Sequence, residues 1–226
     1  MGQTKRLFFI YNPCSGRGLI RTKLFGILQV FSDAGYEMTV HPTRACRDAV
    51  EQIRGLPDGY DLVVCSGGDG TLDEVVQGMM QREKKIPVGY IPAGTVNDFA
   101  RSLRIPRNME SAAPVSAARI AVEGQNYPVD IGTFNSEYFV YIAAFGVFTD
   151  VSYSTSQDMK NVLGHMAYLL EGVKRLTNIP SYHIRLKSQE VTEEGDFIFG
   201  MVTNSRSVGG FKNIIGRRVI CLHFLQ

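Results

Sequence analysis

The chain of 226 residues is long enough for one large domain or two smaller ones, and 44% of its residues are hydrophobic. A formal net charge of +2 gives no indication of nucleic-acid binding, and no apolar run approaches the roughly 18 residues of a membrane-spanning helix. The four cysteines lack paired spacing, which is typical of reduced thiols: Cys14, Cys46, Cys65 and Cys221.

Strands and helices alternate regularly over the first half of the chain. Short apolar or alternating runs predict strands at residues 7–11, 36–41, 60–65 and 86–91. Helical spacing of apolar residues predicts helices at 19–34, 45–54, 72–80, 97–103 and 112–122, with Pro114 in the first turn of the last. This alternation predicts a doubly wound α/β domain over residues 1–124.

The pattern changes near Gln125, where short alternating runs take over. Residues 127–134 and 138–145, joined through Asn135 and Ser136, predict a hairpin. A helix is predicted at 158–177, followed by strands at 182–187 and 197–203, so residues 125–226 form a predicted second, β-rich domain. Its large apolar residues are expected to fill a core, although a pocket for an acyl chain would have the same lining: Phe139, Tyr141, Phe145, Phe148, Met166 and Tyr168.

A glycine-rich turn at residues 65–71, Cys-Ser-Gly-Gly-Asp-Gly-Thr, follows the third predicted strand. Glycines let a ligand approach backbone N–H groups, and the next helix adds its own N-terminal donors, so the turn indicates phosphate binding. Thr71 is predicted to cap that helix, with Glu74 in the capping-box position. The turn is neither a Walker loop nor a dinucleotide fingerprint, and an ordinary structural turn is the alternative.

Two further loops of small residues, at 11–18 and 91–99, also follow predicted strands. Because the carboxyl ends of parallel strands meet at one edge of a sheet, the three loops are predicted to line one cleft. They supply hydroxyls and backbone N–H groups to it: Ser15, Gly16, Gly67, Gly68, Gly70, Thr71, Gly94 and Thr95.

The ordered motifs resemble one family. Asn-Pro-x-Ser-Gly at residues 12–16, Gly-Gly-Asp-Gly-Thr at 67–71 and Pro-x-Gly-Thr-x-Asn-Asp at 92–98 resemble the diacylglycerol kinase catalytic domain of soluble bacterial lipid kinases. Segments at 129–132, 144–147 and 201–210 follow in the same order, so the resemblance spans roughly residues 5–216. Gly-Gly-Asp-Gly-Thr alone also occurs in NAD kinases and phosphofructokinases, and the ordered set gives the specificity.

The resemblance implies ATP-dependent phosphorylation of the hydroxyl of diacylglycerol, or of a related lipid, to give phosphatidic acid, with Mg²⁺ as the second cofactor. It implies nucleotide contacts from three segments: Asn12, Pro13, Cys14, Ser15 and Gly16; Thr43; and Gly67, Gly68, Asp69, Gly70, Thr71, Leu72 and Asp73. Gly94 and Thr95 join them from the third loop.

Three carboxylates at strand ends are the candidate catalytic residues: Asp69, Asp98 and Asp130. We expect them to form a polar network linked to Mg²⁺, which prefers hard oxygen ligands. The structural alternatives are that Asp98 caps its helix and Asp130 pairs with a neighbouring arginine. The metal ligands themselves stay unassigned.

The chain departs from the family after Phe211, where such kinases continue into an acidic segment, further strands and a carboxylate thought to act as general base. Residues 215–226 stand there instead, so the chain looks truncated. The alternative function is a catalytically impaired nucleotide-binding fragment or pseudokinase, and NAD kinase is a weaker one.

The expected location and partners follow from the same features. Residues 7–10 are too short for a signal-peptide core, so we expect a cytoplasmic protein that meets its lipid substrate peripherally at the inner face of the cell membrane. Strands without neighbours at a sheet edge favour a homo-oligomer, and no nucleic acid is expected.

Overall fold

The computed structural model describes residues 4–109, 111–146, 181–187, 192–204, 207–208, 211–212 and 220–222. The chain divides into two compact units, one of Met1–Tyr141 with Asn204–Lys212 and one of Ile142–Thr203 with Asn213–Gln226. The division at residues 124 and 125 expected from the sequence stays a prediction. Each unit is described by itself.

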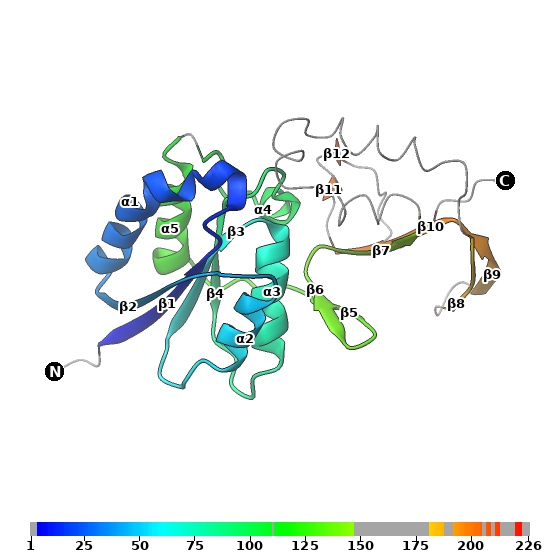
Figure 1. Ribbon diagram of the computed structural model, residues 1–226, viewed down its shortest axis with the longest axis horizontal. Coiled ribbons are helices and arrows are strands. Elements are labelled where there is room, and N and C mark those ends of the chain that lie inside the picture. Colours follow the sequence, from blue (N-terminus) through cyan, green and yellow to red (C-terminus); the bar gives the residue numbers. More distant parts are fainter. Residues whose placement is uncertain are drawn as a thin grey trace. The chain divides into compact units, whose positions relative to one another are not determined.

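The first unit is built on a four-stranded parallel sheet of order β2-β1-β3-β4. Its strands are β1 (Lys5–Tyr11), β2 (Tyr36–Pro42), β3 (Leu62–Gly67) and β4 (Val88–Pro92). Between and after them come η1 (Ser15–Gly18), α1 (Ile20–Asp33), α2 (Asp48–Arg54), α3 (Asp69–Met80), α4 (Asp98–Ser102) and α5 (Ala113–Glu123). Figure 1 shows helices on both faces of the sheet, so the predicted α/β domain is confirmed.

Alternation along the strands explains why both faces are covered. Leu7 and Phe9 of β1 belong to a buried cluster with α1 and α5, whereas Phe8 and Ile10 belong to one with α2 and α3. Successive side chains of a strand point to opposite faces, so a strand buried on both faces needs a continuous apolar run. β3 has that run, and all of its residues are buried.

Two helices begin three residues away from where the sequence predicted, whereas the other three differ by one residue. α3 begins at Asp69 with Gly68 as its N-cap, which places Thr71 inside the first turn, so the predicted Thr71 cap and capping box are wrong. Glu74 instead accepts a hydrogen bond from the Ala49 amide in α2. α2 begins at Asp48 rather than at residue 45, because Arg47 has the left-handed φ of 65° and cannot continue a helix.

The predicted hairpin is present but shorter. β5 (Gly132–Phe134) pairs antiparallel with β6 (Glu137–Phe139), and Asn135 takes a φ of 55° in the turn. The predicted strand at 138–145 is split into two strands. The Val140 amide donates to the Asp73 carboxylate of α3 instead of to a neighbouring strand. The next strand, β7 (Ile142–Gly146), belongs to the second unit. β11 (Ser207–Val208) and β12 (Phe211–Lys212) form a small antiparallel pair in the first unit.

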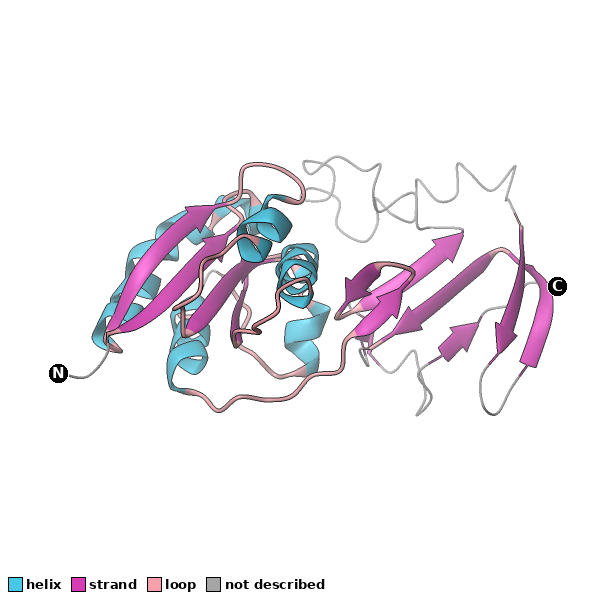
Figure 2. Cartoon of the chain, turned by 90° about the horizontal axis from the view of Figure 1, so that it is seen from below, coloured by secondary structure: helices cyan, strands magenta, loops and turns pink. Residues whose placement is uncertain are grey.

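The described part of the second unit consists of strands (Figure 2). β10 (Phe199–Thr203) lies antiparallel between β7 and β13 (Ile220–Leu222), while β8 (Tyr182–Lys187) pairs with β9 (Thr192–Phe197). The predicted helix at 158–177, with Met166 and Tyr168, and Phe148 lie outside the described residues. Within the described residues, no helix combines the length and apolarity needed to cross a bilayer.

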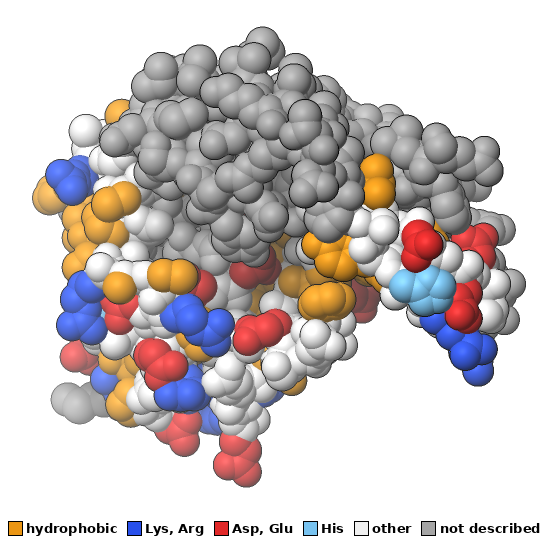
Figure 3. All heavy atoms as spheres, turned by 45° about the vertical axis from the view of Figure 1, so that its right-hand side comes forward, with side chains coloured by type: hydrophobic (Ala, Val, Ile, Leu, Met, Phe, Trp, Pro, Cys, Tyr) orange, Lys and Arg blue, Asp and Glu red, His pale blue; other side chains and the backbone are white. Residues whose placement is uncertain are grey.

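Strand β9 was not predicted, because its sequence Thr-Glu-Glu-Gly-Asp-Phe is charged rather than alternating. Its acidic side chains face basic groups of β8: His183 Nδ1 lies 3.0 Å from Asp196 Oδ1, and Arg185 Nε lies 3.5 Å from Glu194 Oε2. Figure 3 shows acidic, basic and histidine side chains side by side on this hairpin. Such pairs favour one register of an exposed two-stranded ribbon.

Candidate nucleotide-binding and catalytic site

The loops after the four strands are joined to one another by backbone hydrogen bonds at the carboxyl edge of the sheet. The Thr43 amide donates to Tyr11 O at 2.8 Å, the Asn12 amide to Ser66 O at 2.9 Å, and the Ala93 amide to Gly67 O at 2.7 Å. In the order β2-β1-β3-β4 the chain leaves β1 toward one edge and β3 toward the other. This topological switch point is where open α/β sheets bind ligands.

Two glycines of these loops are required by packing within the protein. Gly16 has φ +55°, and a Cβ there would lie 2.1 Å from Ala93 O. A Cβ on Gly94 would lie 2.6 Å from Gly68 Cα and 2.7 Å from Asn97 Oδ1. The first loop therefore packs on the third loop, and the third loop packs on the glycine turn, at distances that only glycine permits.

Gly70 is different. It lies exposed in the first turn of α3, and a Cβ added there would meet no atom within 4 Å. Protein packing gives no reason for glycine at this position, whereas close approach of a ligand to the helix N-terminus does.

Side chains tie the first loop to α3 and order the third loop. Asn12 Nδ2 donates to Thr71 Oγ1 at 3.4 Å, and Asn12 Oδ1 accepts from the Cys14 amide at 2.9 Å. Asn97, buried with a left-handed φ of 53°, exchanges two hydrogen bonds with the backbone of Gly94 through its side-chain amide. The Gly94 amide, expected as a ligand donor, is thus occupied by Asn97.

Asp69 and Asp98 come together, as their places at strand ends suggested. Asp69 Oδ2 accepts from the Asp98 amide at 2.9 Å, and Oδ1 from the Phe99 amide at 3.3 Å. Asp98 is fully buried, and its Oδ2 accepts from the Tyr141 hydroxyl at 2.7 Å. Burial raises the pKa of Asp69, and the nearby charge of Asp98 adds to the effect.

Asp73 and Gln77 lie one and two turns along the same helix. Asp73 Oδ1 accepts from the Val140 amide at 2.9 Å, and Gln77 Oε1 accepts from the Tyr138 amide at 2.7 Å. Burial raises the pKa of Asp73 to about 6, with the Asp69 charge as a further cause. Asp73 therefore holds the segment around β6, a structural contact additional to the nucleotide role that the family resemblance implied.

The place of Asp130 in the carboxylate network stays a prediction. Asp130 is exposed, and its backbone carbonyl accepts a hydrogen bond from the Asn204 side-chain amide. Tyr141 was expected as a core residue or as lining of an acyl-chain pocket, and no local pattern marks its contact with Asp98, 43 residues away.

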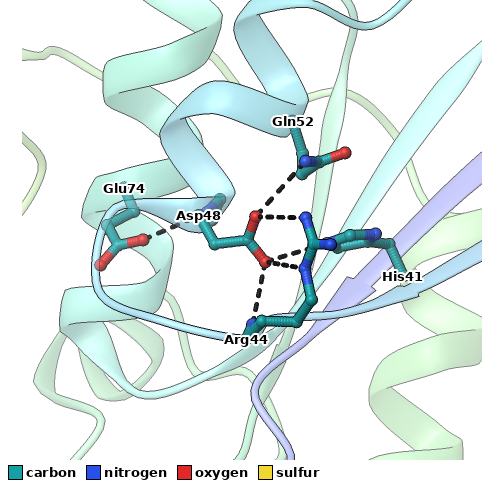
Figure 4. Close-up of polar contacts among 6 residues, drawn as sticks. His41, Arg44, Asp48, Gln52 and Glu74 are labelled. Atoms are coloured by element: carbon teal, nitrogen blue, oxygen red, sulfur yellow. Dashed lines mark hydrogen bonds and ion pairs between the residues drawn. The ribbon is translucent and has the colours of Figure 1, made fainter.

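The loop after β2 contains Thr43 and is held by a polar cluster (Figure 4). The Asp48 carboxylate accepts from His41 Nε2 at 3.0 Å, from the Arg44 amide at 2.9 Å and from Gln52 Nε2 at 3.3 Å. The Arg44 guanidinium, followed by His41, holds the pKa of Asp48 well below its usual range.

Residues 6–134, more than half of the chain, match the family described as the diacylglycerol kinase catalytic domain. The chain belongs to this family. It is 35% identical over 212 residues to a diacylglycerol kinase of Staphylococcus carnosus (strain TM300), covering 93% of this chain and 68% of the relative. It is 36% identical over 211 residues to that of Bacillus subtilis (strain 168), with the same coverage.

A solved diacylglycerol kinase structure from Bacillus anthracis str. Sterne matches this fold with a TM-score of 0.75 at 25% identity. The match covers 96% of this chain and 72% of that one. The sequence resemblance to diacylglycerol kinases is therefore confirmed by family, relatives and fold.

Mg²⁺ is typical of diacylglycerol kinase chemistry. Within the described ranges, no group of three or more His, Cys, Asp and Glu side chains is arranged to hold a metal. Mg²⁺ commonly keeps several waters and is bound by one or two carboxylates together with substrate phosphates. A carboxylate has about four lone-pair sites, so Asp69 retains acceptor capacity beyond its two amides. This donor set fits an ion that arrives with the nucleotide rather than a preformed cage.

Proposed function

We propose that this diacylglycerol kinase family member binds ATP at the carboxyl edge of its parallel sheet and transfers the γ-phosphoryl group to the hydroxyl of diacylglycerol. The observation that carries the proposal is the joining of four loops, after β1, β2, β3 and β4, across one topological switch point. The relatives' names support a lipid kinase over the pseudokinase and NAD kinase alternatives.

The nucleotide phosphates would lie against the first turn of α3. Gly70 leaves the backbone of this turn open, and a helix N-terminus favours anions through its unpaired N–H groups and its dipole. Asn12 and Thr71 border the turn from the first loop and α3, and Thr43 borders the first loop from the other side. These contacts support the proposed nucleotide residues as one set.

Phosphoryl transfer requires little covalent work by the protein, so positioning and charge neutralisation dominate. Asp69, which is partly exposed, is the carboxylate that would meet a magnesium ion, which when bound would neutralise the phosphate charge. The fully buried Asp98 would position Asp69 through its backbone amide. Asp69 also fixes α4 through two amides, so the same side chain links the glycine turn to the third loop.

The phosphoryl acceptor is the hydroxyl group of the lipid. Diacylglycerol carries two acyl chains and stays in the bilayer, so we propose that the enzyme reaches its hydroxyl by peripheral contact from the cytoplasmic side. On the face drawn in Figure 3, acidic and basic side chains are mixed, so the proposal relies on substrate chemistry rather than on a basic patch.

Calorimetry with ATP, and a kinase assay with dioleoylglycerol in mixed micelles, test the proposal directly. The full chain should bind ATP and form phosphatidic acid. Gly70→Val should abolish ATP binding without unfolding the protein, because its side chain enters open space at the helix N-terminus. Gly195→Val is the matched control: it lies in β9, where the nearest atom to an added Cβ is 3.8 Å away. A folded wild-type chain without ATP affinity at millimolar concentration would refute the function.

A further inference from the structure

One carboxylate fixes the loop after β2, and it comes from the next helix. Asp48, the first residue of α2, has 9% of its side chain exposed. It accepts from His41 in β2, from the Arg44 amide in the loop, and from the Arg44 guanidinium at 3.3 and 3.4 Å. A single side chain therefore joins the strand, the loop and the helix, as Figure 4 shows.

The loop held in this way lies against the glycine loops. The Thr43 amide donates to Tyr11 O, and Tyr11 precedes Asn12, whose side chain reaches Thr71 in α3. The position of Thr43 relative to the site thus depends on two contacts. Its own amide is bonded to Tyr11 O of β1, and the amide of the next residue, Arg44, is bonded to the Asp48 carboxylate.

A second contact ties the helix that carries Asp48 to the helix that begins at the glycine turn. Glu74 Oε2 of α3 accepts from the Ala49 amide at 3.3 Å. Arg47, immediately before Asp48, is held in the left-handed region at φ 65°, a conformation that is unfavourable for a non-glycine residue. The surrounding contacts therefore maintain a specific and locally unfavourable path for this loop.

We propose that Asp48 is a positioning residue for the nucleotide: it holds the loop of Thr43 and Arg44 in the conformation that receives ATP. The inference rests on the proposed function, through the nucleotide contact assigned to Thr43. Asp48 acts through the loop, because its carboxylate is largely buried and engaged by protein donors.

A purely structural role makes a different prediction. A carboxylate in the first turn stabilises a helix through the dipole, so its loss would lower the melting temperature and leave ligand affinity unchanged in folded protein. Affinity for the nucleotide, rather than stability, separates the two roles.

The test compares Asp48→Asn with Glu51→Gln in the full chain, using ADP as the calorimetric probe. Glu51 is the matched control: it is an exposed carboxylate of the same helix, paired with Arg54 and not with the loop. Asp48→Asn should weaken ADP binding about tenfold, the amount that one lost hydrogen bond to a charged group supplies, and should raise the KM for ATP without changing the KM for lipid. Glu51→Gln should bind ADP as the wild type does.

Amide hydrogen exchange at Arg44 keeps the inference separate from the function. Exchange of this amide in the ligand-free protein should be faster in Asp48→Asn, whether or not the chain is a kinase. Unchanged Arg44 exchange, or unchanged ADP affinity in the folded variant, would overturn the inference; a wild-type chain that binds no ADP would instead overturn the proposed function. If Asp48→Asn does not fold, Arg44→Ala serves, because it removes the exposed guanidinium contacts, and unaltered ADP affinity there counts equally against the proposal.

Discussion

The carboxylate of Asp69 accepts the backbone amide of Asp98 at 2.9 Å, so the first residue of α3 is bonded to the first residue of α4. Two candidate catalytic residues, 29 residues apart, are thereby joined through the backbone amide of Asp98. The arrangement places the partly buried Asp69 carboxylate at the glycine turn, where a transferred phosphoryl group and its metal would need it.

Asp69→Asn should lower lipid phosphorylation by several kcal/mol of transition-state stabilisation, while ATP affinity changes by less than about 1 kcal/mol. The amide oxygen can still accept one backbone N–H, so the fold is retained. Asp61→Asn is the control, because Asp61 accepts from the Arg6 amide at the start of β1, away from the carboxyl edge. Steady-state kinetics with ATP and dioleoylglycerol measure both effects, and undiminished turnover would show that Asp69 only positions α4.

Asp73→Asn should make folding stability less dependent on pH. The folded-state pKa of about 6 lies above the usual value, so the folded protein binds more protons between about pH 4 and 6 and its stability falls as pH rises through that window. The asparagine oxygen can still accept from Val140 without a buried charge, so the variant should gain up to about 3 kcal/mol above pH 6. Urea unfolding at pH 4, 6 and 8 measures the change, and a variant less stable than wild type at pH 8 contradicts it.

Gly94→Ala should destabilise the protein, whereas Gly70→Ala should not. The new methyl at Gly94 would meet Gly68 Cα at 2.6 Å, a backbone atom that cannot rotate away. At Gly70 it meets open space, and alanine is better than glycine in a helix by about 1 kcal/mol. Thermal melts of both variants without nucleotide check this difference, and equal melting temperatures would mean that the two loops separate easily.

Tyr141→Phe should cost about 1–3 kcal/mol of stability, because it removes a hydroxyl donor from the buried Asp98 carboxylate. Tyr138→Phe is a suitable comparison, since the recorded contact of Tyr138 with Gln77 uses its backbone amide. Chemical unfolding of the two variants should show a loss only for Tyr141→Phe. A similar loss in both would assign the effect to aromatic packing instead.

Local sequence patterns predicted the alternation of strands and helices in the first half, and they located the three small-residue loops at strand ends. Those features are local: apolar periodicity defines each element, and glycine shows where backbone must bend or approach closely. The same reasoning placed Asp69 and Asp98 at neighbouring strand ends, and sheet topology then brought them together.

The partner of each polar side chain, in contrast, depends on how the whole chain folds. Thr71 and Glu74 have the spacing of a capping box, yet α3 begins at Asp69 and Glu74 binds α2, because contacts between helices outweigh a local cap. Asp73 binds the amide of Val140, which lies 67 residues away, and Asp98 binds the hydroxyl of Tyr141. Asp48 binds the Arg44 amide of the loop that precedes it. The charged strand β9 carries no apolar alternation, and its pairing depends on side chains of β8. Long-range hydrogen bonds and ion pairs leave no periodic signal in a sequence, so residues that position others become visible only when the chain is folded.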